Sequence, residues 1–251
     1  LYSNDVNATI TYTDLYDIKY PSPGPTNQRI FHIRPTIAYT HDPSKYYFLH
    51  APGSSNFFAL YWVENPLTAP VLRGSVVPTI SYSAPPDANQ LGGGTPLIST
   101  NGAQLQNEPV FKDGHLWSVH SIRNPSAANY SALHYVKINT ATGTAAEQSI
   151  LGANGLWYYF GAIAIDKFNN AAMTFARSGD TEYAGAFYSS KFANETNFTY
   201  SSPLQTGKAN YVKTFGGTRN RWGDYMGIWL DPENQTDFVI FTQYASASNT
   251  W

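Results

Sequence analysis

Short apolar runs, each followed by turn residues, form the main pattern along this chain. Near the C-terminus a polar and aromatic stretch at 219–225 leads into an apolar run at 226–230 and then a turn at 231–234. Upstream, an aromatic stretch at 155–161 leads in the same way into an apolar run at 162–165 and a turn rich in Asp and Asn. A second strand-like run follows both turns. This recurrence of aromatic loop, strand, turn and strand predicts a repeat fold made of β-hairpins.

Two more hairpins of this kind lie in the first half of the chain, at 34–50 and 108–120. The four copies place turn aspartates 71, 53 and 65 residues apart, at Asp42, Asp113, Asp166 and Asp231. With insertions, this spacing is near the ~40–50-residue period of propeller blades. Asp side chains bond their own backbone in turns, so we expect these four to form turns rather than to act in catalysis.

The pattern predicts an all-β fold, because no segment of helical length keeps apolar positions at helical spacing. We expect a β-propeller with about four recognisable blades, part of a six- or seven-bladed ring, with a β-sandwich as the alternative. Residues 1–29 are expected to be an N-terminal segment or the end of an upstream blade. Residues 30–251 would form the blades. Within them, residues 81–107 are rich in Pro and Gly and predict one long loop.

Composition narrows the classes of function. Charged residues make up 13% of the chain and the net charge is −2, without a basic cluster, which argues against a nucleic-acid partner. No apolar run approaches the roughly 18 residues that suggest a membrane span. The chain has no Cys, which excludes a disulfide scaffold, a thiolate nucleophile and Cys-ligated zinc. We expect an extracellular or cell-surface protein.

The predicted ligand-binding residues come from one face of the blades. In a four-stranded blade, the loop before the first strand and the loop after the second strand lie on the same side. Arginines and aromatic residues occupy these positions: Arg34, Arg123, Arg177, Arg221, Trp157, Trp222 and Tyr225. Guanidinium groups bind carboxylates in a bidentate manner, and exposed aromatic rings suit sugars, so an acidic glycan is the predicted ligand.

A purely structural role is the alternative for several of these residues. Arg221 and Asp224 could pair to tie a loop corner, with Trp222 packed between blades. Arg123 and Arg177 could bond loop carbonyls. For metals, the six histidines are scattered and predict no zinc site, whereas a calcium site from loop oxygens stays open.

Four segments together carry a resemblance to a known group. The runs at 84–92, 104–107, 112–117 and 221–225, the last reading Arg-Trp-Gly-Asp-Tyr, look like those of secreted bacterial β-propeller proteins that are loosely similar to sialidase-type propellers. The resemblance implies further blades, supplied upstream, by a second copy or by a complementary chain. The chain departs from the sialidase pattern, since residues 246–251 only partly match an Asp-box.

Candidate catalytic residues are few. If the protein is an enzyme, a glycoside hydrolase needs an acid and a base. The carboxylates expected on the predicted face are Glu108 and Asp224, with Asp180 and Glu182 on the loop after Arg177. The sialidase resemblance implies a tyrosine nucleophile, for which Tyr159 or Tyr225 would serve, with Glu108 beside Tyr159 as base. No Gly-x-Ser-x-Gly elbow or phosphate loop is present.

The preferred hypothesis is therefore an extracellular binding or assembly module that recognises an acidic glycan or another extracellular protein. The alternative is a glycoside hydrolase or lyase of sialidase-like type acting on an acidic glycan. No cofactor is expected apart from the calcium option.

Overall fold

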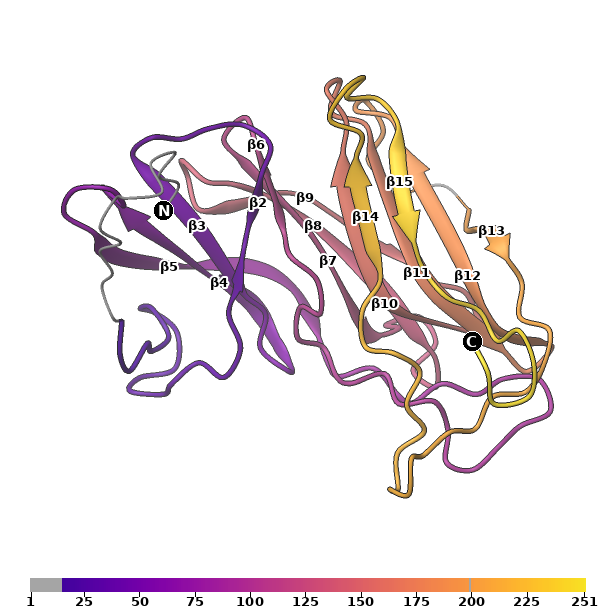
Figure 1. Cartoon of the computed structure of the whole chain (residues 1–251). Helices are drawn as coiled ribbons and strands as arrows, with labels where there is room; N and C mark the ends of the chain where they lie inside the picture. The colour runs from indigo at the N-terminus through magenta and orange to yellow at the C-terminus, as the bar shows by residue number, and fades with distance from the viewer. Residues whose placement is uncertain (1–14, 199) are drawn as a thin grey trace, which may run out of the picture.

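The computed structural model describes residues 15–198 and 200–251, which form fifteen β-strands and no helix (Figure 1). The first sheet contains β1 (Arg34–Pro35), β3 (Lys45–His50), β4 (Ser55–Glu64) and β5 (Val71–Tyr82). The second contains β2 (Ile37–Ala38), β6 (Val110–Lys112), β7 (His115–Arg123), β8 (Ser131–Asn139) and β9 (Thr144–Leu151). The all-β prediction is confirmed.

The remaining strands form two further sheets. The third sheet contains β10 (Leu156–Ile165), β11 (Ala171–Gly179), β12 (Glu182–Lys191) and β13 (Ser202–Gln205). The fourth contains only β14 (Gly227–Leu230) and β15 (Phe238–Phe241). Within each sheet the strands lie in sequence order and pair antiparallel, except that β2 pairs parallel with β6. Since β1 and β2 are consecutive in the chain, this segment passes from the first sheet to the second. Figure 1 shows the first three sheets following one another across the molecule, with β14 and β15 lying over the third sheet.

Apolar side chains hold each sheet to the next. Phe58 of β4 and Leu116 of β7 share one fully buried cluster between the first and second sheets. Val119 and Phe175 belong to a second cluster between the second and third sheets. A third cluster joins β10 to Ile228 of β14. Burying each of these large side chains contributes about 1.5–3 kcal/mol, so the sheets stabilise one another in series.

The described part of the N-terminal segment covers the outer face of the first sheet. The Tyr61 hydroxyl donates to the Lys19 carbonyl at 2.8 Å. The Tyr20 ring meets Phe57 edge-on at 5.9 Å, and its hydroxyl lies 2.9 Å from His50 Nε2. These contacts give the first sheet an apolar cover on the side away from the second sheet.

The turn aspartates behave largely as predicted. Oδ1 of Asp42 accepts from the Ser44 N–H at 2.9 Å, Asp166 from Phe168 at 2.8 Å and Asp231 from Glu233 at 2.8 Å. Asp113 differs, because it has a positive φ of 48° and an ion pair with Lys112. The Asp-Gly pair at 113–114 makes the predicted hairpin between β6 and β7.

The structure corrects the prediction of an aromatic loop at 155–161. Nearly all of that stretch belongs to β10, where Trp157 pairs with Ser178 and Tyr159 with Ala176. A bulge follows at Phe160, whose φ is 58°. The long loop is real but begins later than predicted, because β5 extends to Tyr82 and regular structure resumes only at Val110.

Candidate functional site

Arg34, at the start of β1, contacts two other predicted site residues, Glu108 and Tyr225. Its Nε donates to the Leu105 carbonyl at 3.1 Å, and its Nη1 lies 3.7 Å from Glu108 Oε1. The guanidinium carbon is 5.5 Å from the centre of the Tyr225 ring, within range of a cation–π interaction. The Arg34 side chain is 19% exposed, that of Glu108 is 42% exposed, and Tyr225 is 61% exposed. The Arg34 guanidinium is therefore mostly buried, whereas the Glu108 carboxylate and the Tyr225 ring that contact it are exposed to solvent.

Asp224 links the same region to the long loop. Its Oδ1 accepts from Asn101 Nδ2 at 2.6 Å, and its Oδ2 pairs with the Arg221 guanidinium. Arg219 donates to Ser99 Oγ at 2.9 Å and to the Asn101 side chain. We call Arg34, Asn101, Glu108, Arg221, Asp224 and Tyr225 the arginine–tyrosine face.

The Arg-Trp-Gly-Asp-Tyr motif forms a fixed corner beside this face. Trp222 is fully buried and meets Tyr211 edge-on at 5.0 Å, while its carbonyl accepts from the Gln243 side chain. Gly223 has a φ of 111°, and a Cβ there would lie 2.8 Å from Gln243 Oε1. Glycine is therefore required at this corner, since other residues rarely adopt such a φ. The buried Trp222 aims Asp224 and Tyr225 outwards.

The long loop is held by backbone-like pairing with the same corner. Gln90 uses its side-chain amide as a strand would, donating to the Tyr211 carbonyl at 2.5 Å and accepting from the Tyr211 N–H at 2.9 Å. Ile98 forms a parallel bridge with Asn220. Asn107 Nδ2 donates to the Gly161 carbonyl at 2.9 Å. The arginine–tyrosine face is thus supported by the long loop and the segment around 211–220, which are far apart in sequence but hydrogen-bonded to each other.

The structure places three predicted aromatic residues inside the protein. Trp157 is 7% exposed and lies 4.7 Å from Tyr130, while Trp222 and Tyr159 are fully buried. The Tyr159 hydroxyl lies 3.2 Å from Ser178 Oγ, and burial raises the pKa of this tyrosine. As folded, these side chains offer no surface to a ligand, and the Tyr159 hydroxyl is closed to a substrate. Trp157 and Tyr159 fill the core because β10 is buried on both faces, whereas Trp222 is buried in the motif corner against Tyr211.

Arg123 and Arg177 are not brought to the arginine–tyrosine face. Arg123 donates to the Ala128 carbonyl at 2.6 Å, as its structural alternative predicted. Arg177 forms a bidentate pair with Glu182 at 2.7 and 2.8 Å and packs 3.8 Å above the centre of the Phe187 ring. The expected convergence of four arginines is therefore wrong: the β11–β12 hairpin itself supplies a carboxylate to Arg177. Glu182 was expected on the predicted face as a separate carboxylate, and its five-residue spacing from Arg177 is the signal that the two side chains pair.

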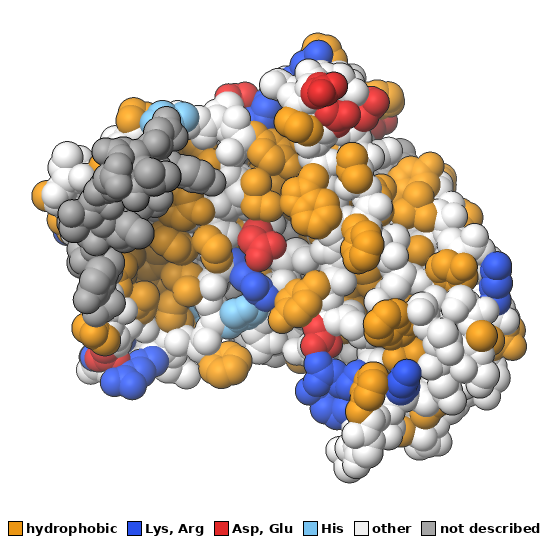
Figure 2. Space-filling view, in the orientation of Figure 1, with side chains coloured by type: hydrophobic (Ala, Val, Ile, Leu, Met, Phe, Trp, Pro, Cys, Tyr) orange, Lys and Arg blue, Asp and Glu red, His pale blue; other side chains and the backbone are white. Residues whose placement is uncertain are grey.

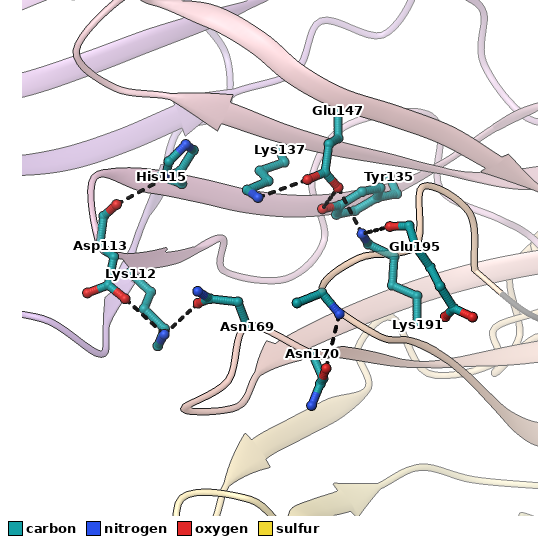
Figure 3. A network of polar contacts seen from close by, with 11 residues as sticks. Lys112, Asp113, His115, Tyr135, Lys137, Glu147, Asn169, Asn170, Lys191 and Glu195 are labelled. Carbon is teal, nitrogen blue, oxygen red and sulfur yellow. Dashed lines mark hydrogen bonds and ion pairs between the residues drawn. The ribbon is translucent and has the colours of Figure 1, made fainter.

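A second polar network joins the second and third sheets. Figure 3 shows the Glu147 carboxylate between Lys137 and Lys191, each at 2.8 Å, with the Tyr135 hydroxyl at 3.2 Å. Burial alone would raise the pKa of Glu147, but hydrogen bonds from the two lysines outweigh it and lower that pKa. The Lys191 side chain is only 3% exposed. Because the Lys191 ammonium is buried, it is not accessible to a ligand. The network therefore connects the second sheet to the third.

The other half of Figure 3 shows the same kind of tie between two turns. Lys112 Nζ contacts Asp113 at 2.9 Å and also the Asn169 side chain in the β10–β11 turn. Asn170 accepts from the Ala193 N–H at 3.0 Å. These bonds fix the turns that follow β6, β10 and β12 against one another.

Neither a metal site nor a known relative adds to this picture. Within residues 15–198 and 200–251, no three His, Cys, Asp or Glu side chains gather closely enough to hold a metal ion. The same residues include no helix with the length and apolarity needed to cross a bilayer. Comparisons with protein-family models, with curated proteins and with solved structures find no match to this chain. Function therefore has to be argued from the arginine–tyrosine face.

Proposed function

We propose that the four sheets are consecutive blades of a β-propeller. Apart from the parallel β2–β6 pair, each sheet is a local antiparallel meander. The inner strands are neighbours: β2, which follows β1 of the first sheet in the chain, pairs with β6, and β10 packs against both β6 and β14. A propeller arranges the first strands of its blades around one axis, whereas a sandwich divides its strands between two sheets. The arginine–tyrosine face then lies where the first strands begin, the side on which propellers commonly bind ligands.

We further propose that the protein is an extracellular or cell-surface module that binds an acidic glycan on the arginine–tyrosine face. The observation that carries this proposal is Tyr225, whose ring is 61% exposed while Arg34 and the motif corner hold it in place. An aromatic ring that is both fixed and exposed loses little entropy on binding a sugar ring. Arg221, 42% exposed, offers donors to a sugar carboxylate.

The ion pairs of the arginine–tyrosine face favour a binding function over a catalytic one. Each arginine of the face already has a carboxylate partner, Glu108 for Arg34 and Asp224 for Arg221. Such pairs orient ligand groups well, and they hold both carboxylates of the face against arginines instead of leaving them free as an acid and a base. A glycoside hydrolase or lyase remains the second candidate, because two carboxylates flank Tyr225.

The test compares Tyr225 with an exposed aromatic residue away from the arginine–tyrosine face. Wild type, Tyr225→Ala and Phe168→Ala are titrated by calorimetry with uronic-acid, sialic-acid and neutral oligosaccharides at low and high salt; Phe168, in the β10–β11 turn, is 62% exposed and serves as the control. We expect Tyr225→Ala to weaken acidic-glycan binding about tenfold or more, roughly 1.4 kcal/mol, with Phe168→Ala unchanged. Binding should weaken at high salt because the charges involved are exposed.

Two results would contradict the proposal. An equal loss of glycan affinity in both variants, or no binding of any glycan by wild type, would show that this face does not bind a glycan. Release of cleaved sugar by wild type, abolished in Glu108→Gln while binding persists, would establish the hydrolase or lyase in its place.

A further inference from the structure

The fourth sheet has fewer strands than its neighbours and an open edge. Its two strands pair in one register, from Gly227 opposite Phe241 to Leu230 opposite Phe238. Within residues 15–198 and 200–251, only β14 pairs with β15, so the other side of β15 presents unpaired main-chain N–H and C=O groups. Such an edge is a template for another strand.

A groove runs beside this edge. β10 and β11 pack against β14, whereas β12 and β13 extend the third sheet beyond the fourth. The resulting groove between β12 and β15 has a volume of about 650 Å³ and is lined by Ala172, Tyr188, Phe192, Phe238 and Ile240, among others.

Apolar side chains also cover the opposite face of the fourth sheet. Trp229 is 49% exposed, Val239 58% and Phe241 76%. Val239 lies directly opposite Trp229 in the register, so these rings and the valine share one face, while Phe238 and Ile240 point to the other. Figure 2 shows hydrophobic side chains gathered over the region of β14 and β15. A strand added along β15 would therefore place one set of its side chains in the groove and the other set beside the exposed Val239 and Phe241.

The charges around the groove favour a basic occupant. Lys191 lines it but is 3% exposed and paired with Glu147. Glu195 and Asp237 also line it, and neither forms an ion pair with a described residue; their carboxylates accept hydrogen bonds from the Phe192 N–H at 2.7 Å and from Asn234 Nδ2 at 2.9 Å. The accessible charge is therefore negative.

Self-pairing of β15 between two copies is excluded by the third sheet. In a twofold pairing, both copies would keep their third sheets on the same side of the joined sheet. β12 and β13 of each copy would then occupy the space beneath β15 and β14 of the other. A single extended segment avoids this overlap because it needs only the groove.

We propose that the outer edge of β15 binds an extended segment of another protein by β-strand addition, with apolar residues at its centre and a basic residue at its ends. Main-chain hydrogen bonds would provide affinity, and the groove would select alternate side chains. This inference does not depend on the glycan-binding proposal, because it uses different residues and a different ligand.

The test uses labelled heptapeptides and the full chain. Fluorescence anisotropy is measured with Lys-Val-Thr-Ile-Thr-Val-Lys, with the same peptide carrying Glu at both ends, and with a version N-methylated at alternate residues. We expect the first peptide to bind, and the acidic and N-methylated peptides to bind at least tenfold more weakly. Absence of binding, or equal binding of the N-methylated peptide, would overturn strand addition.

A matched pair of variants locates the site. Val239→Lys places a charge on the open edge, while Val71→Lys does so on β5, an edge strand of the first sheet where the valine is 39% exposed. Only Val239→Lys should weaken peptide binding, by about tenfold or more. Hydrogen exchange of wild type provides a second readout: the amides of β15 should gain protection when the basic peptide is added. Equal loss in both variants, or unchanged exchange at β15, would refute the assignment.

Discussion

His120 and His134 lie where the first sheet meets the second, and both are fully buried. His120 Nδ1 donates to the Ala103 carbonyl at 2.6 Å, and its Nε2 lies 2.9 Å from His134 Nδ1. Phe58 and Tyr82 pack edge-on against the His120 ring at 5.1 and 4.7 Å. The pair thus links the long loop, β7 and β8 to the first sheet in its uncharged form.

The burial of this pair predicts acid sensitivity. Burial lowers the pKa of His120 to about 3, helped by the neighbouring His134, and lowers that of His134 to about 4, from 6.5 in the unfolded chain. Between pH 6.5 and about 4 the unfolded state binds protons that the folded state does not. Stability should therefore be full above pH 6.5 and fall with decreasing pH by up to about 1.4 kcal/mol per pH unit for each histidine.

Urea unfolding at pH 7.5, 6.0 and 5.0 measures this loss. His134→Gln should flatten the dependence on pH, whereas His41→Asn, at an exposed turn histidine, should leave it unchanged. The same slope in wild type and His134→Gln would show that other groups cause the acid sensitivity.

Glu147 provides a second prediction at the residue scale. Glu147→Gln removes the charge that Lys191, 3% exposed, needs as its partner. We expect a loss of about 3 kcal/mol in the free energy of unfolding at pH 7, because a buried cation is left without compensation. Glu64→Gln is the control: its partner Arg73 is 56% exposed, so the loss should stay below about 1 kcal/mol. Equal effects in chemical denaturation would contradict the role of Glu147 as a tie between sheets.

Among the structural elements, the motif corner is set by its glycine. Gly223→Ala would force alanine into a φ of 111° and place its Cβ against the Gln243 side chain. We expect a loss of about 1–3 kcal/mol and weaker glycan binding, because Asp224 and Tyr225 would shift. Gly217→Ala in the same loop is the control, since its Cβ would meet only the Thr214 carbonyl at 3.4 Å. Thermal melts and glycan titration measure both; an unaffected Gly223→Ala would show that the corner does not position the face.

The sequence predicts elements well where the information is local. The turns at Asp42, Asp166 and Asp231 and the Asp-Gly hairpin depend on residues within a few positions of one another. β10 was misread because its two faces enter different clusters, so its aromatic run lacks the alternation typical of a half-exposed strand.

The site could be predicted only in part, because some of its contacts join residues that are far apart in the sequence. Arg34, Glu108, Asp224 and Tyr225 were identified from their positions before first strands. Asn101 was not, because its bond to Asp224 spans 123 residues and no local pattern reports it. Arg177 was misassigned because its ion pair with Glu182, a carboxylate of its own hairpin, was not predicted.

For the whole molecule, the sheets are expected to differ in local stability. The third sheet has four strands and packs on both faces, whereas the fourth has two strands of four residues with an open edge and exposed Val239 and Phe241. Regions with few buried contacts open without global unfolding, because little apolar area is lost when they do.

Native-state hydrogen exchange tests this difference. We expect the amides of β15 to exchange about 100-fold faster than those of β11, roughly 2.7 kcal/mol less protection. The glycan should not change this ratio, because the arginine–tyrosine face lies on other segments, whereas a strand bound to β15 should reduce it. Equal protection of β11 and β15 in the free protein would mean that the fourth sheet unfolds only together with the rest of the molecule. In that case the open edge of β15 would not be less stable than the third sheet, and a bound strand could not act by stabilising it locally.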